Sequence, residues 1–206
     1  MSFMTTNMFA LRIWGFDPTS AQTRIALGAG WRRSDILWEG LMEGGNVAWL
    51  AGDIPLAARL FRRAFWVAKL TFARSDLRHA AAQANLGMIA RRQGRSARAT
   101  AHFKRAGQVW DAHAADAIAL MTIAPRARSS LFHLRMEARH RETYHDNFRL
   151  RLSRIGGEVR ASLDCLERGK KPTCRLYTRW RGERPNVYDD TRKVLGACLL
   201  IAEPQG

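Results

Sequence analysis

The sequence has 206 residues and a formal net charge of +16, from 34 Lys and Arg against 18 Asp and Glu. Its 47% hydrophobic and 25% charged residues can form a buried core, which excludes a globally disordered chain. The uncharged apolar stretches 117–124 and 194–202 are too short for a membrane span, which needs about 20 residues. The length fits one domain of about 100–200 residues with appendages, or two small domains.

The positive charge is spread evenly along the chain. Residues 1–100 contain 14 basic and 6 acidic residues, and residues 101–206 contain 20 and 12. Most of the basic residues are arginine, 29 against five lysines. A charge excess favours an anionic partner, but a dedicated nucleic-acid module concentrates its charge on one element or tail. The charge alone is therefore a weak indicator of the partner.

Residues 1–35 are predicted to form an amino-terminal packing or capping segment. Apolar side chains such as Phe9, Ile13 and Trp14 supply its buried surface. No basic stretch precedes an apolar one here, so no secretory signal is expected and the predicted location is the cytoplasm.

Residues 36–112 contain an internal repeat of 42 residues. When residues 45–69 are placed over residues 87–111, eight of 25 positions are identical. The identical pairs are Gly45/Gly87, Ala48/Ala90, Gly52/Gly94, Ala57/Ala99, Phe61/Phe103, Arg63/Arg105, Ala64/Ala106 and Val67/Val109. Small residues allow helices to approach closely, an aromatic residue fills the space opposite, and glycine closes a turn. The pattern predicts two helical hairpins, with helices near 36–51, 54–74, 77–93 and 96–112.

Local signals agree with these helix starts. Asp53 is a polar N-cap residue followed by Pro55 in the first turn. Asp76 precedes the third helix, and Ser96 follows Gly94 at the start of the fourth.

The repeat resembles the tetratricopeptide repeat (TPR) family over about residues 38–112. The framework of that family is a Leu-Gly pair, a small residue, a turn glycine, then Ala, a large apolar residue and Ala. The second copy matches it at Leu86, Gly87, Ala90, Gly94, Ala99, Phe103 and Ala106. The first copy matches it at Gly45, Ala48, Gly52, Ala57, Phe61 and Ala64, with Gly44 in place of the leucine.

Residues 113–168 are predicted to add helices over 113–124 and 129–168, separated by Pro125. They are expected to form a cap or a diverged third unit. No further copy appears at the 42-residue spacing, and two hairpins alone bury too small a hydrophobic core. Gly156 and Gly157 are expected to bend or interrupt the second helix. Residues 169–206 are predicted to be a basic carboxyl-terminal extension, with a final helix over 187–202.

The resemblance to TPR proteins implies a partner-binding groove lined by the first helix of each hairpin. The residues implied to face it are Met42, Asn46, Trp49, Ala84, Asn85, Met88, Arg91 and Arg92. Two of them, Asn46 and Asn85, are similar to asparagines that hold a peptide carboxylate in chaperone-binding members, although Met42 replaces an expected lysine. The arginines predicted to steer an acidic partner are Arg59, Arg62, Arg63, Arg91, Arg92, Arg95 and Arg98.

An alternative site lies in the carboxyl-terminal extension, where arginines alternate with aromatic residues. Guanidinium groups neutralise phosphates while aromatic faces stack on bases, which is typical of nucleic-acid contact. The residues of this alternative polyanion site are Arg175, Tyr177, Arg179, Trp180, Arg181 and Arg184.

The sequence supports neither catalysis nor a metal site. The cysteines Cys165, Cys174 and Cys198 are odd in number and do not have zinc-ligand spacing, so inert thiols are expected. The pairs Glu137/His140 and Glu142/His145 fit exposed salt-bridging residues better than a carboxylate-bridged metal centre. No nucleotide-binding or hydrolase motif occurs.

We therefore predict an all-α protein with TPR-like hairpins, without cofactor or enzymatic activity. Its predicted role is an adaptor, assembly factor or accessory subunit that docks an acidic or amphipathic segment of another protein. The alternative is a nucleic-acid-binding regulator.

Overall fold

The computed structural model describes residues 20–28, 30–120, 141–170 and 201–202, which form helices joined by short turns and contain no strand. The helices are α2 (Ala21–Gly28), α3 (Arg33–Leu50), α4 (Ile54–Thr71), α5 (Arg78–Arg92), α6 (Ser96–Ala119) and α8 (Arg141–Glu167). The all-α prediction is confirmed for this part of the chain. Of the helices that the structure describes, none has both the length and the apolar character that crossing a bilayer requires.

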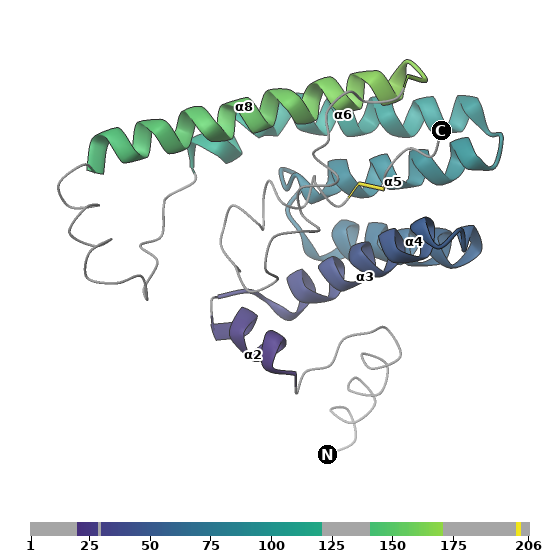
Figure 1. The fold of residues 1–206 in the computed structure, drawn as a ribbon, viewed down its shortest axis with the longest axis horizontal. Coiled ribbons are helices and arrows are strands. Elements are labelled where there is room, and N and C mark those ends of the chain that lie inside the picture. Colours follow the sequence, from purple (N-terminus) through teal and green to yellow (C-terminus); the bar gives the residue numbers. More distant parts are fainter. Residues whose placement is uncertain (1–19, 29, 121–140, 171–200, 203–206) are drawn as a thin grey trace.

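The helices from α3 to α8 pack in chain order, each against the next (Figure 1). The pairs α3/α4 and α5/α6 are joined by tight turns at Gly52 and Gly94, whose φ angles are +79° and +72°. Helix α8 lies along α6 and extends the row. Positive φ angles favour glycine, so the turn positions expected from the sequence agree with the backbone.

The two helix pairs repeat one close contact. A Cβ atom on Gly45 would overlap the Phe61 ring, and one on Gly87 would lie 2.7 Å from Cε1 of Phe103. Both phenylalanine rings are fully buried. In each pair, then, glycine on the first helix admits the ring of the second, which explains why these positions recur at the 42-residue spacing.

Two of the predicted helix starts have the expected polar contact. Asp53 Oδ1 accepts a hydrogen bond from the Leu56 backbone N–H at 2.9 Å. Asp76 Oδ1 accepts one from the Arg78 N–H, also at 2.9 Å. The third start differs, because Ser96 is already helical and Arg95 precedes α6 as an N-cap residue without a side-chain bond.

The structure corrects the predicted break after residue 112, and it excludes the predicted interruption at Gly156 and Gly157. Helix α6 runs without interruption to Ala119, since residues 113–119 contain no helix breaker and bury Ala114 against the core. Helix α8 continues through Gly156 and Gly157. A Cβ on Gly156 would lie 3.0 Å from Cδ1 of Ile118, so this glycine allows α8 to approach α6 closely. Pro125 and most of residues 169–206 lie outside the described residues.

Candidate functional site

The residues predicted to line a groove between the first helices are mostly in the interior. Met42, Trp49, Ala84, Asn85 and Met88 are at most 3% exposed, and Asn46 is half-buried. This face is covered in the structure, so a partner would reach these residues only by displacing what lies on them.

Asn85 is the polar centre of that covered face. Its Nδ2 donates to Met42 Sδ on α3 at 3.7 Å, and its Oδ1 accepts from the Ala202 backbone N–H at 2.7 Å. Ile201 and Ala202 are themselves buried within the core. The asparagine therefore bonds to the protein's own chain in this structure.

Arg91 is also engaged internally. Its guanidinium donates to the Leu166 carbonyl oxygen in α8 and lies 4.6 Å from the centre of the Phe103 ring. Burial lowers the pKa of Arg91. Arg92, in contrast, is exposed at the end of α5. Arg91 thus links the end of α5 to the Leu166 carbonyl at the end of α8, and its predicted role in binding a partner stays a prediction.

A buried charged cluster around Arg78 joins α3 to α5, and the sequence analysis did not identify it. The Arg78 side chain donates to Asp35 Oδ1 and to Asp76 Oδ2, both at 2.5 Å, and is only 5% exposed. Its guanidinium carbon also lies 3.4 Å from the centre of the Phe72 ring. Burial lowers the pKa of Arg78, but the bonds and charges of Asp76 and Asp35 outweigh it and the net shift is upward. This arginine is fully paired and therefore structural.

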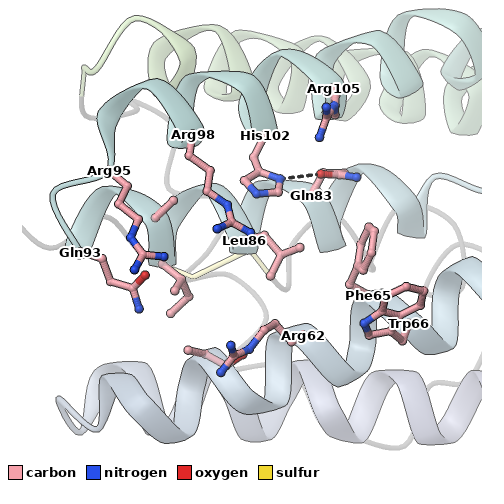
Figure 2. A pocket seen from close by; sticks show the side chains of 13 residues that line it. Arg62, Phe65, Trp66, Gln83, Leu86, Gln93, Arg95, Arg98, His102 and Arg105 are labelled. Carbon is pink, nitrogen blue, oxygen red and sulfur yellow. Dashed lines mark hydrogen bonds between the residues drawn. The ribbon is translucent and has the colours of Figure 1, made fainter.

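A groove with a different character lies across α4, α5 and α6 (Figure 2). We call it the arginine groove; its volume is about 260 Å³. Its apolar lining consists of Ala58, Phe65, Trp66, Leu86, Ile89 and Ala90, and its polar lining of Arg62, Gln83, Gln93, Arg95, Arg98, His102 and Arg105. No acidic residue lines it. The groove therefore combines an apolar surface with four positive charges.

None of the four arginines forms an ion pair within the described residues. Arg62 Nε donates to the Ala58 carbonyl of its own helix at 3.1 Å, which leaves its charge uncompensated. Arg95 immediately precedes α6 and Arg98 lies in its first turn, which has no acidic residue. Cations are unfavourable at the positive end of a helix, by about 0.3–1 kcal/mol each. Arg95 and Arg98 therefore do not stabilise α6. A bound ligand of opposite charge would neutralise them.

His102 lies among these arginines. Its Nδ1 is 2.8 Å from Gln83 Oε1, which can only accept, so Nδ1 carries the proton of the neutral ring. Burial lowers the pKa of His102, and the charges of Arg98 and Arg105 lower it further. The neutral ring thus adds no charge at pH 7 and presents Nε2 as an acceptor.

The arginine groove contains part of the predicted set of steering arginines. Arg62, Arg95 and Arg98 line it, whereas Arg59 and Arg63 do not. Arg105 and the two aromatic residues were not predicted. Helical spacing could have indicated them, because Arg98, His102 and Arg105 are four and three residues apart and share one face of α6.

Other predicted sites fall where the structure gives no side-chain description. The alternative polyanion segment, from Arg175 to Arg184, lies outside the described residues, as do the side chains of both Glu/His pairs. In the described part of the chain, no group of three or more His, Cys, Asp or Glu is arranged to hold a metal ion. Cys165 is a free, half-buried thiol.

Comparison of the chain with protein-family models, with curated proteins and with solved structures yields no match.

Proposed function

We propose that this protein is a non-catalytic docking module, an adaptor, assembly factor or accessory subunit, whose arginine groove binds an acidic amphipathic segment of a partner protein. The observation that carries the proposal is the set of four arginines around an apolar lining with no carboxylate among them. A protein does not stabilise itself by gathering like charges on one face, so the arrangement fits a partner that supplies the opposite charge.

The chemistry of the groove suggests the composition of that segment. Guanidinium groups form bidentate hydrogen bonds with carboxylates, which favours aspartate and glutamate side chains at the rim. The apolar lining favours a large hydrophobic side chain between them. Small-molecule sites have volumes of about 300–1,000 Å³, so a groove of about 260 Å³ is better suited to one or two inserted side chains than to a cofactor. Trp66, 52% exposed at the groove, offers an aromatic surface for this contact.

The proposal keeps the TPR-like architecture but changes the docking surface. The shared glycine–phenylalanine contact of the two helix pairs supports reading residues 38–112 as TPR-like hairpins, with the flanking segments as caps. The arginine groove, however, is lined by the second helices of both hairpins, α4 and α6, together with α5, the first helix of the second hairpin. The face of the first helices that includes Met42 and Asn85 is buried in this structure.

The proposal can be tested with a fluorescein-labelled peptide in which one tryptophan is flanked by glutamates, and with the same peptide carrying glutamine in place of glutamate. Fluorescence anisotropy would be measured at 50 and 200 mM salt. We expect the acidic peptide to bind and the glutamine peptide not to bind. The double variant Arg95→Glu/Arg98→Glu should weaken binding tenfold or more, because a hydrogen bond to a charged group contributes about 1.5–3 kcal/mol.

The matched control is Arg59→Glu/Lys104→Glu, which changes the net charge equally at exposed positions outside the groove. It should weaken binding less than threefold at 200 mM salt, because exposed distant charges are then largely screened. Equal losses in the two double variants would show that only the overall charge attracts the peptide, and would overturn the proposal. A partner captured from cells should likewise be lost by the first double variant and retained by the control.

A further inference from the structure

The segment Ile201–Ala202 is buried against the helices although it is not helical itself. It belongs to no helix, yet both residues are at most 3% exposed. Figure 1 shows this segment, in yellow, beside α5. Its described polar contact is the bond from the Ala202 backbone N–H to Asn85 Oδ1, across 117 residues of sequence. Neither of the two described residues is part of a helix, so both depend on tertiary contacts.

Asn85 binds this segment as a side-chain amide binds a peptide ligand. The amide oxygen accepts from a main-chain N–H, while the amide nitrogen is anchored on Met42 of α3. The two described residues add one branched apolar side chain and one methyl group to the buried core. A main-chain N–H and small apolar side chains are features that a segment of another protein could equally provide.

We infer that Ile201–Ala202 is a displaceable internal ligand of the face formed by Met42 and Asn85, and that it excludes other segments from that face. The inference shares no residue with the arginine groove and does not depend on it. The two described residues of the segment contribute one isoleucine, one alanine and one hydrogen bond from the Ala202 N–H, which stabilise far less than the whole helical core does. The segment can therefore leave while the helices stay folded, as a local opening.

Amide hydrogen exchange of the full, unmodified chain tests the displacement. We expect the Ala202 amide to exchange at least a hundredfold faster than the slowest amides of α5, with little dependence on denaturant. An Ala202 amide that exchanges as slowly as the slowest α5 amides, with their denaturant dependence, would show that the segment opens only on global unfolding. That result would overturn the inference.

A labelled peptide of residues 199–206 tests the binding face directly in full-length protein. The variant Ala202→Pro removes the N–H that Asn85 accepts, which weakens the internal competitor. It should bind the peptide about tenfold more tightly than the wild type does, the value of roughly one buried hydrogen bond. The matched control Ala202→Ser keeps the N–H and should bind as the wild type does.

A second peptide, N-methylated at its alanine, leaves the protein unchanged and removes only the donated hydrogen. It should bind Ala202→Pro about tenfold more weakly than the unmodified peptide does. Equal binding of both peptides, or no binding to any variant, would overturn the inference. The peptide contains one glutamate, which could bind the arginine groove instead. Its affinity must therefore stay the same when Arg95→Glu/Arg98→Glu is added to the protein, which shows that it binds the face formed by Met42 and Asn85.

Discussion

Arg78 and the arginines of the groove are the same side chain in two opposite settings. Arg78 is buried, bonded to two carboxylates and stacked on an aromatic ring. Arg62, Arg95, Arg98 and Arg105 surround an apolar lining and have no carboxylate partner in the described part of the chain. Both sets lie within the same two helix pairs.

The difference distinguishes an arginine whose charge is neutralised inside the protein from arginines whose charge is available to a partner. A buried arginine is tolerated only when its hydrogen bonds and charge are fully satisfied. An exposed arginine costs little by itself, but several together, near the start of a helix, repel one another and oppose the helix dipole. The number of arginines is therefore uninformative until their partners are known.

Breaking the paired setting should have the largest effect. Asp35→Ala leaves Arg78 buried with only Asp76, and we expect it to lower the free energy of unfolding by about 3–5 kcal/mol. Urea denaturation followed by circular dichroism measures the change. The control is Asp111→Ala, because Asp111 pairs with Arg160 at 2.6 Å but both side chains are partly exposed. It should cost less than about 1 kcal/mol, and a similar cost for both variants would contradict the comparison.

The next largest effect concerns the helix packing that positions both sets of arginines. Gly45→Ala and Gly87→Ala should each destabilise by about 1–3 kcal/mol, because the added methyl group meets a buried phenylalanine ring. Gly40→Ala is the control, since no atom lies near its Cβ position. It should stabilise α3 by about 0.5–1 kcal/mol. Phe61→Leu combined with Gly45→Ala should recover part of the loss, and a loss unchanged by Phe61→Leu would exclude the ring as its cause.

Reversing the unpaired charges should have a smaller effect on stability, with the opposite sign. Arg95→Glu and Arg98→Glu place negative charges at the amino end of α6, which should stabilise the protein by about 0.3–1 kcal/mol each at low salt. Thermal unfolding at 20 and 200 mM salt measures the gain and its screening. These variants should therefore be more stable and bind the acidic peptide less well. Destabilisation by either would show that its arginine has a structural role.

The smallest effect should come from His102. Because its pKa is lowered in the folded protein by burial and by Arg98 and Arg105, the unfolded chain binds a proton more readily. The contribution of His102 to stability is therefore complete above its unfolded pKa of about 6.5 and declines as the pH falls below that value. Urea denaturation from pH 7.5 to 5.0 should show this decline, and His102→Gln should reduce it.

The acidic peptide should change the titration of the same histidine. Carboxylates in the groove would offset the arginine charges, so NMR titration should show a higher pKa for His102 when the peptide is bound. An unchanged pKa at saturating peptide would place the peptide outside the groove.

Helix positions could be predicted from the sequence because their signals are local. Asp53 with Pro55, the turn glycines and the glycine–phenylalanine pairs recur at one spacing and specify the two helix pairs. The predicted break after residue 112 was wrong because no helix breaker occurs there, and α6 continues to Ala119 with Ala114 buried.

The sequence by itself therefore determined the all-helical class, the 42-residue repetition of contacts and the excess of arginine, since composition and short-range periodicity express these properties directly. Only the tertiary structure decided which arginines are paired and which face of the helices is open. Asp35 meets Arg78 across 43 residues, and Asn85 meets Ala202 across 117. Such contacts depend on how distant segments pack, because burial and pairing of a charge are properties of its three-dimensional surroundings rather than of its neighbours in the chain.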